Sequence, residues 1–343
     1  MKKVFLHGYF CDNLGDDLFV RHICTLYPDV EFHIVIEGDF GQAFASIENL
    51  IIHRFSFFDR IFDKLFKRWF FRERIAKTCD TIVHIGGSVF IQGNNWADKF
   101  KNYKRLFNSC KKKFIVGANF GPYTDINYLN SYKEFFSEFD GICFRDKYSY
   151  KLFSDLEQVN YAPDILFSYG FDFYKKKSSE KTVAFSVMNK GEIYLNKIAQ
   201  LADDFVEKGY RIILIGFSRF EGDLIAVNKV EELMEHTCEK HMYSSDIDDT
   251  LSILAKADLI FATRFHSMVL GWGFEKKVYP CIYSNKMLTV IEDLHPEQKY
   301  CTLENIKQLS IDEIFEGSFP TDISEIKVKS KTHFETIGGI LNE

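Results

Sequence analysis

The sequence lacks the features that define several special classes of protein. It has no apolar run of 18 or more residues, so no segment is predicted to cross a bilayer. Its eight cysteines include no C-x-x-C pair and its ten histidines no H-E-x-x-H motif, so no metal site is expected. Basic residues number 43 against 49 acidic ones, a deficit that argues against a general nucleic-acid-binding protein.

The start of the sequence is also not predicted to be a signal peptide. The apolar run after Met1-Lys2-Lys3 is too short for a signal h-region and ends without a small-residue cleavage site, so it predicts a first strand. The scattered cysteines then fit reduced, mostly buried thiols. We therefore expect a cytoplasmic protein.

Two α/β domains are predicted from the 343 residues, of which 46% are hydrophobic. Short β-branched or aromatic runs alternate with helical stretches, which is typical of doubly wound, Rossmann-like parallel sheets. We expect domains at 1–174 and 181–295 that face a cleft, a linker at 174–181, and a tail at 296–343 that packs back as a helix. The expected strands lie at about 3–9, 31–37, 81–87, 113–120, 141–145, 181–188, 210–217, 257–263 and 278–283.

In the first domain, small and polar residues follow three of these strands. Three loops carry them, and their candidate ligand-binding residues are Asn13, Gly15 and Asp16, then Gly86, Gly87 and Ser88, then Asn119. The first loop lacks the G-x-G-x-x-G of a dinucleotide fold, and its carboxylates suit sugar hydroxyls better than an anion. A capped helix and two tight structural turns explain the same residues without a ligand.

Cationic residues follow three other strands. Arg145 begins Arg-Asp-Lys-Tyr-Ser149, Arg264 begins Arg-Phe-His266-Ser267, and Lys286 ends Tyr-Ser-Asn-Lys. An Arg fork, an imidazole and a helix start together suit a phosphate or a carboxylate. The alternative is a surface arginine beside a helix-start histidine that is held by local hydrogen bonds.

Taken in order, these pieces resemble the polysaccharide pyruvyl transferase family. The matching pieces are Asn13-Leu-Gly15-Asp16, Gly86-Gly87, Gly121-Pro122, Arg145-Asp146-Lys-Tyr-Ser149, Pro163-Asp164, Arg264-Phe-His266-Ser267 and Tyr283-Ser-Asn-Lys286, which span about four-fifths of the chain. One departure is Ser88, where members of the family often carry a third glycine.

The resemblance implies a fold like that of GT-B glycosyltransferases and the transfer of pyruvate from phosphoenolpyruvate onto a sugar as a ketal. Phosphoenolpyruvate is then a co-substrate, and no cofactor or metal is expected. The acceptor is a surface polysaccharide or its lipid-linked precursor. In the family, the positions of Arg145, Arg264 and His266 are associated with the donor site, and we expect these three to act in the reaction.

Charge predicts which domain takes which substrate. Arg264, His266, Ser267 and Lys286 would attract an anionic donor to the second domain, whereas Asp16 and its acidic neighbours would repel it and bind an acceptor sugar. His266 is the candidate for proton transfer because imidazole titrates near neutral pH. Three alternatives stay open: a GT-B glycosyltransferase with a nucleotide-sugar donor, a non-catalytic binding protein, and a nucleic-acid-binding protein.

The segment 54–77 does not fit the α/β alternation. Its apolar residues have helical spacing, and it carries eight cations against three anions in a chain that is acidic elsewhere. One interpretation is an amphipathic helix (Phe58, Ile61, Phe62, Leu65, Phe66, Trp69, Phe70) that touches the inner face of the membrane. The other is an ordinary helix whose apolar face is buried against the sheet.

Overall fold

The computed structural model describes residues 2–174 and 181–341, which form two compact units. The first unit contains the chain up to Phe10, Asp16–Ile165, and the chain from Val328 on. The second contains Cys11–Gly15 and Leu166–Lys327. A short segment near the start of the chain therefore belongs to the second unit, and the end of the chain belongs to the first. The expected ranges 1–174, 181–295 and 296–343 do not contain this exchange. The expected linker falls mostly on 175–180, outside the described residues.

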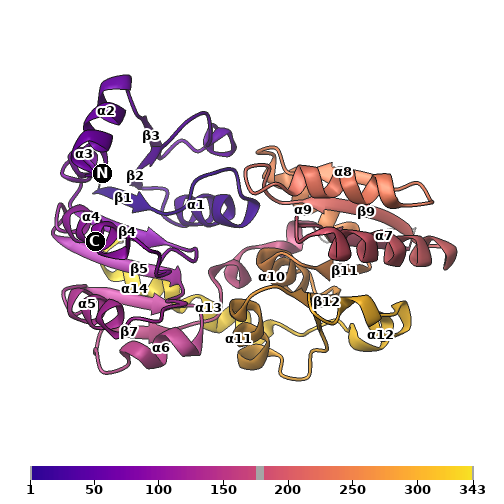
Figure 1. Ribbon diagram of the computed structural model, residues 1–343. Coiled ribbons are helices and arrows are strands. Elements are labelled where there is room, and N and C mark those ends of the chain that lie inside the picture. Colours follow the sequence, from indigo (N-terminus) through magenta and orange to yellow (C-terminus); the bar gives the residue numbers. More distant parts are fainter. Residues whose placement is uncertain (1, 175–180, 342–343) are drawn as a thin grey trace. The chain divides into compact units, whose positions relative to one another are not determined.

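A seven-stranded parallel sheet forms the first unit, in the order β3-β2-β1-β4-β5-β6-β7 (Figure 1). The strands are β1 (Lys2–His7), β2 (Val30–Ile36), β3 (Leu50–Arg54), β4 (Thr81–Ile85), β5 (Lys112–Ala118), β6 (Gly141–Phe144) and β7 (Val159–Tyr161). The helices are α1 (Leu14–Leu26), α2 (Phe57–Phe66), α3 (Phe70–Ala76), α4 (Trp96–Phe107), α5 (Ile126–Phe136), α6 (Lys147–Phe153) and α14 (Thr332–Leu341).

The second unit repeats this plan with six parallel strands in the order β10-β9-β8-β11-β12-β13. These are β8 (Thr182–Ser186), β9 (Arg211–Gly216), β10 (Glu239–Met242), β11 (Leu259–Ala262), β12 (Lys277–Ile282) and β13 (Cys301–Thr302). The helices are α7 (Glu192–Glu207), α8 (Asp223–Leu233), α9 (Ile247–Lys256), α10 (Phe265–Gly273), α11 (Asn285–Leu294) and α12 (Ile311–Gly317), and α13 (Ser324–Ser330) leads back to the first unit.

Both sheets confirm the predicted Rossmann-like α/β fold. All nine expected strands form, and four further strands were not predicted. In each sheet the strand order reverses once, between β1 and β4 and between β8 and β11. Doubly wound folds bind ligands beyond the carboxyl ends of the strands at such a switch point.

The tail forms three helices instead of one, and the last of them packs on the first sheet. In α14, the buried His333 accepts a hydrogen bond at Nδ1 from the Gly117 amide (3.2 Å) and donates from Nε2 to the Pro163 carbonyl (2.8 Å). Burial lowers the pKa of His333 to about 4. These two bonds require a neutral imidazole, because one ring nitrogen must accept.

Segment 54–77 forms two helices, α2 and α3, so the expectation of a single helix is wrong. The chain leaves α2 at Lys67, whose φ of 48° lies in the left-handed region and breaks the helix. Trp69 then turns inward and packs against the core. None of the helices that the structure describes has the length and apolar character needed to cross a membrane.

Candidate functional site

The switch point of the second sheet holds the first candidate site. β11 ends at Ala262, and Arg264 is the N-cap residue of the buried helix α10, with extended backbone angles. His266 lies in the first turn of that helix, two residues after Arg264. Ser267 is buried, and its hydroxyl donates to the Arg264 carbonyl at 2.7 Å, which secures the helix start.

Two carboxylates bind the guanidinium of Arg264. Asp223, which is fully buried, accepts from Nε at 3.1 Å and from the second terminal nitrogen, and Glu221 accepts from the first. Burial would lower the pKa of Arg264, but the two carboxylates outweigh it and raise that pKa. The guanidinium, which we expected to attract an anionic donor, is therefore paired with carboxylates of the protein itself.

Glu221 also connects this cluster to the start of the chain. Its carboxylate accepts from the Asn13 side-chain amide at 3.1 Å, and its side chain stays one-third exposed. Burial tends to raise the pKa of Glu221, but Arg264, Asn13 and the charge of Lys286 outweigh it. The pKa is therefore lowered overall, and Glu221 remains a carboxylate.

His266 packs directly against Gly15, 251 positions earlier in the chain. A methyl group built on Gly15 would lie 1.8 Å from His266 Nδ1, which is far inside contact distance. Gly15 therefore leaves the space that the half-buried imidazole occupies. Asn13 and Gly15, expected on the acceptor side of the first domain, belong to the unit that holds Arg264 and His266.

Two lysines lie over aromatic rings near this cluster. The Lys286 ammonium is 5.6 Å from the ring centre of Phe265 and 5.5 Å from that of Tyr283, and Lys190 is 4.4 Å from Tyr283. Such contacts hold a cation in place without neutralising its charge. These lysines therefore add positive charge beside the neutralised Arg264.

A second polar cluster lies in the first unit, around Arg145. Its guanidinium is buried and pairs with Asp164 at 3.0 Å, and it donates to Asn119 (2.9 Å) and Ser88 (3.2 Å). The Ser88 hydroxyl in turn donates to Asn119 at 2.7 Å. The structure thus brings Ser88 and Asn119, expected to bind acceptor, together with Arg145, expected to bind donor.

The remaining first-unit candidates line the neighbouring loops. Gly86 and Gly87 have φ of 65° and 76°, which favours glycine, and a Cβ on Gly87 would lie 3.5 Å from the buried Asp16 carboxylate. Asp146 caps α6 by accepting from the Ser149 amide at 2.7 Å, and Ser149 accepts from the Phe120 amide. Much of the Arg-Asp-Lys-Tyr-Ser motif is therefore explained by local structure.

The sequence model of one family, polysaccharide pyruvyl transferase, matches residues 13–285. The chain belongs to this family. Similar solved structures share 9–13% identity with it, which shows the fold alone. They include HepE of Anabaena bound to UDP and glucose (TM-score 0.58, 13% identity, 98% of this chain and 96% of that one).

Two further similar structures are described as bound to UDP or to UDP-GlcNAc. MnaA of S. aureus bound to UDP has a TM-score of 0.66, 13% identity and coverage of 100% and 98% of the two chains. The UDP-GlcNAc 2-epimerase of Neisseria meningitidis has a TM-score of 0.65, 9% identity and coverage of 99% and 100%. The chain thus shares a two-domain, Rossmann-like α/β fold with these glycosyltransferase and epimerase structures of the GT-B type.

Sequence reasoning missed the two carboxylates that hold Arg264 in this member of the pyruvyl transferase family. Neither Asp223 nor Glu221 was singled out as a candidate. The available signal was their place after the predicted strand 210–217, where a doubly wound fold collects polar side chains.

Proposed function

We propose that the protein transfers a pyruvyl group from phosphoenolpyruvate onto a sugar of a surface polysaccharide or its lipid-linked precursor. The single observation that best supports this, beyond family membership, is the cluster of His266, Arg264 and Lys286 at the switch point of the second sheet. It offers an imidazole for proton transfer beside cations for the donor's carboxylate and phosphate.

The reaction adds two sugar hydroxyl groups to the central carbon of phosphoenolpyruvate. The methylene carbon gains a proton and becomes a methyl group, and the carbon–oxygen bond to phosphate breaks. One hydroxyl proton balances the new methyl group, and the other leaves with inorganic phosphate. In the proposed mechanism His266 moves these protons, because Glu221, with its lowered pKa, stays ionised and is a poor acid.

Arg264 can bind a donor only if one of its two carboxylate partners gives up its hydrogen bond to the guanidinium. A bidentate pair with the buried Asp223 fixes one side of the guanidinium, whereas Glu221 is partly exposed and can be displaced. We therefore assign Arg264 and Lys286 to the donor, and Ser88, Asn119 and the Gly86-Gly87 turn of the first unit to the acceptor sugar. Arg145, which is paired with Asp164, orients the Ser88 and Asn119 side chains that would bind this sugar.

Incubation with phosphoenolpyruvate and a panel of lipid-linked or model glycosides tests the proposal. We expect phosphate release together with a pyruvyl mass increase on one glycoside. His266→Ala should lower the rate of both at least a hundredfold, and His236→Ala, which alters an exposed histidine of the same unit, should change neither. Turnover with a nucleotide sugar, but not with phosphoenolpyruvate, would instead support the glycosyltransferase alternative, whose fold the UDP-bound neighbours share.

A further inference from the structure

The apolar face of α2 lies in solvent. Helix α2 has no buried residue, and six of its ten positions are large apolar residues that are 45–73% exposed: Phe57, Phe58, Ile61, Phe62, Leu65 and Phe66. At 3.6 residues per turn these fall on one arc of about 180°. The sequence-based alternative of a core-facing stripe is therefore wrong for α2, although Trp69 does pack inward.

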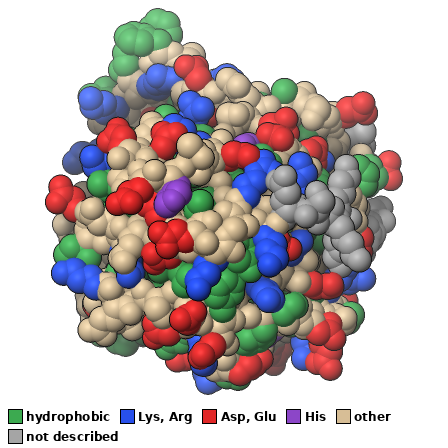
Figure 2. All heavy atoms as spheres, turned by 90° about the vertical axis from the view of Figure 1, so that its right-hand side faces the viewer, with side chains coloured by type: hydrophobic (Ala, Val, Ile, Leu, Met, Phe, Trp, Pro, Cys, Tyr) green, Lys and Arg blue, Asp and Glu red, His purple; other side chains and the backbone are tan. Residues whose placement is uncertain are grey.

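Six neighbouring exposed apolar side chains are costly in water, and such a patch marks a binding surface. Figure 2 shows hydrophobic side chains that project at the top of the molecule, at the height of α2 in Figure 1, with basic side chains beside them. The polar side of α2 carries Asp59, Arg60, Asp63 and Lys64. Its two acidic residues are engaged locally, because Asp59 accepts from the amide of the N-cap residue Ser56 and pairs with Arg74, and Asp63 accepts from the Phe71 amide.

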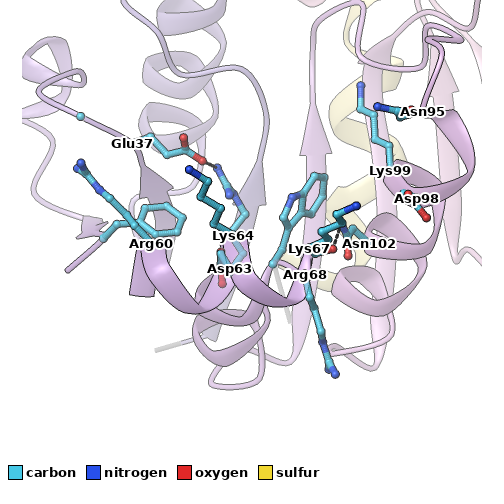
Figure 3. A pocket seen from close by; sticks show the side chains of 14 residues that line it. Glu37, Arg60, Asp63, Lys64, Lys67, Arg68, Asn95, Asp98, Lys99 and Asn102 are labelled. Carbon is cyan, nitrogen blue, oxygen red and sulfur yellow. Dashed lines mark hydrogen bonds and ion pairs between the residues drawn. The ribbon is translucent and has the colours of Figure 1, made fainter. Parts of the chain in front are cut away.

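A cationic pocket of about 720 Å³ adjoins this helix (Figure 3). Six basic residues line it against three acidic ones, an excess of three positive charges: Arg60, Lys64, Lys67, Arg68, Arg72 and Lys99 against Glu37, Asp63 and Asp98. Arg68 is paired with Glu73, and Arg72 with Glu37. Within residues 2–174 and 181–341, the side chains of Arg60, Lys64 and Lys67 have no ion-pair partner.

The deeper wall of the pocket also favours an anion. Lys99, on α4, donates to the Val89 carbonyl at 3.0 Å, and burial lowers the pKa of its ammonium group. The Arg72 guanidinium lies 5.1 Å from the ring centre of Phe55 and 5.5 Å from that of Trp69. A bound phosphate would relieve the mutual repulsion of these cations.

We propose that α2 docks the protein on an anionic phospholipid bilayer, with its apolar arc in the headgroup layer and a lipid phosphate in the adjoining pocket. Charge complementarity favours this occupant: a protein surface that covered the apolar arc would also have to neutralise three unpaired cations. An amphipathic helix with aromatic residues on one face and cations on the other is the type that binds interfaces. The inference does not rest on the proposed function.

Co-sedimentation of the full chain with vesicles tests the docking. We expect binding to phosphatidylcholine vesicles that contain phosphatidylglycerol, much weaker binding to phosphatidylcholine alone, and a loss of binding as salt rises. Leu65→Ser should weaken binding about tenfold. Ile225→Ser is the matched control, since both side chains lie on helices and are 70% and 67% exposed.

The charge contribution has its own matched pair of variants. Arg60→Gln with Lys64→Gln should weaken binding to anionic vesicles about 25-fold, at roughly fivefold for each cation. Lys151→Gln with Lys256→Gln removes the same charge from exposed positions on other helices and should leave binding unchanged. Because α2 has no buried residue, its variants should fold, which circular dichroism checks.

Three results would overturn the proposal. The first is no sedimentation of the wild type with anionic vesicles, and the second is equal sedimentation with neutral and anionic ones. The third is self-association in sedimentation velocity that Leu65→Ser abolishes without any vesicle binding, which would make this face an interface between two copies of the chain.

Discussion

Replacing Gly15 by alanine tests whether the start of α1 positions His266. The new methyl group would lie 1.8 Å from Nδ1 and 2.2 Å from Cγ of the imidazole. Cγ is the ring atom attached to the side chain's own Cβ, so spinning the ring in place cannot remove the overlap. The whole imidazole must swing about χ1, or the backbone at Gly15 must shift.

The expected stability change is the difference between two opposing effects. Alanine is favoured over glycine within a helix by up to about 1 kcal/mol. Overpacking costs about 1–3 kcal/mol, so we expect Gly15→Ala to lower the free energy of unfolding by about 1–2 kcal/mol. If His266 transfers protons, its displacement should also lower kcat about a hundred- to ten-thousand-fold.

Urea unfolding and turnover with phosphoenolpyruvate measure the two effects separately. Gly93→Ala and Gly170→Ala are matched controls, because a methyl group at either position meets no atom within 4 Å and neither glycine has a positive φ. The double variant Gly15→Ala/His266→Ala should recover most of the lost stability, since it removes the clashing ring. A Gly15→Ala protein with wild-type stability and turnover would refute the packing argument.

Three further predictions concern single groups. His266→Ala should lower kcat at least a hundredfold with little change in KM for phosphoenolpyruvate, in steady-state kinetics, and a change in KM alone would make His266 a binding residue. Asp164→Asn leaves Arg145 buried without its counter-ion and should cost about 3–5 kcal/mol in urea unfolding. Asp98→Asn, at an exposed pair, should cost under about 1 kcal/mol. Because the folded pKa of His333 is about 4, below its ordinary 6.5, its stabilising contribution is complete above pH 6.5 and is lost as pH falls toward 4, by about 3 kcal/mol in total. His333→Gln should flatten this pH dependence in urea titrations, and an unchanged slope would contradict it.

The strands that the sequence predicted are the nine interior strands of the two sheets, and the four that it missed are the edge strands. β3, β7, β10 and β13 each lie at an end of a strand order. An interior strand is buried on both faces and reads as a continuous apolar run, whereas β10 is Glu-Lys-His-Met and β13 has two residues. Edge strands form because a neighbour pairs with them, which local sequence does not encode.

The residue types of the candidate site could be read from the sequence, but their pairings could not. Arg264 and His266 were singled out because both follow the apolar run 257–263, and the second sheet places them at its switch point. The bond from Arg264 to Asp223 spans 41 positions, and the contact of His266 with Gly15 spans 251. Charges that neutralise one another over such separations look unpaired in the sequence, so the site seemed more cationic than it is.

That internal neutralisation bears on how the donor would be taken up in the proposed reaction. Arg264 is balanced by Asp223 and Glu221, so the positive charge near His266 comes from Lys286 and Lys190. A donor carboxylate that reaches Arg264 must therefore displace Glu221, the one partner that is partly exposed. The displaced Glu221 carboxylate would keep its hydrogen bond from the Asn13 amide. The segment from Asn13 to Gly15 would then respond to phosphoenolpyruvate at one end, and it contacts the His266 imidazole at the other. In the proposed reaction, donor binding would thus be connected with the position of the His266 imidazole through three consecutive residues.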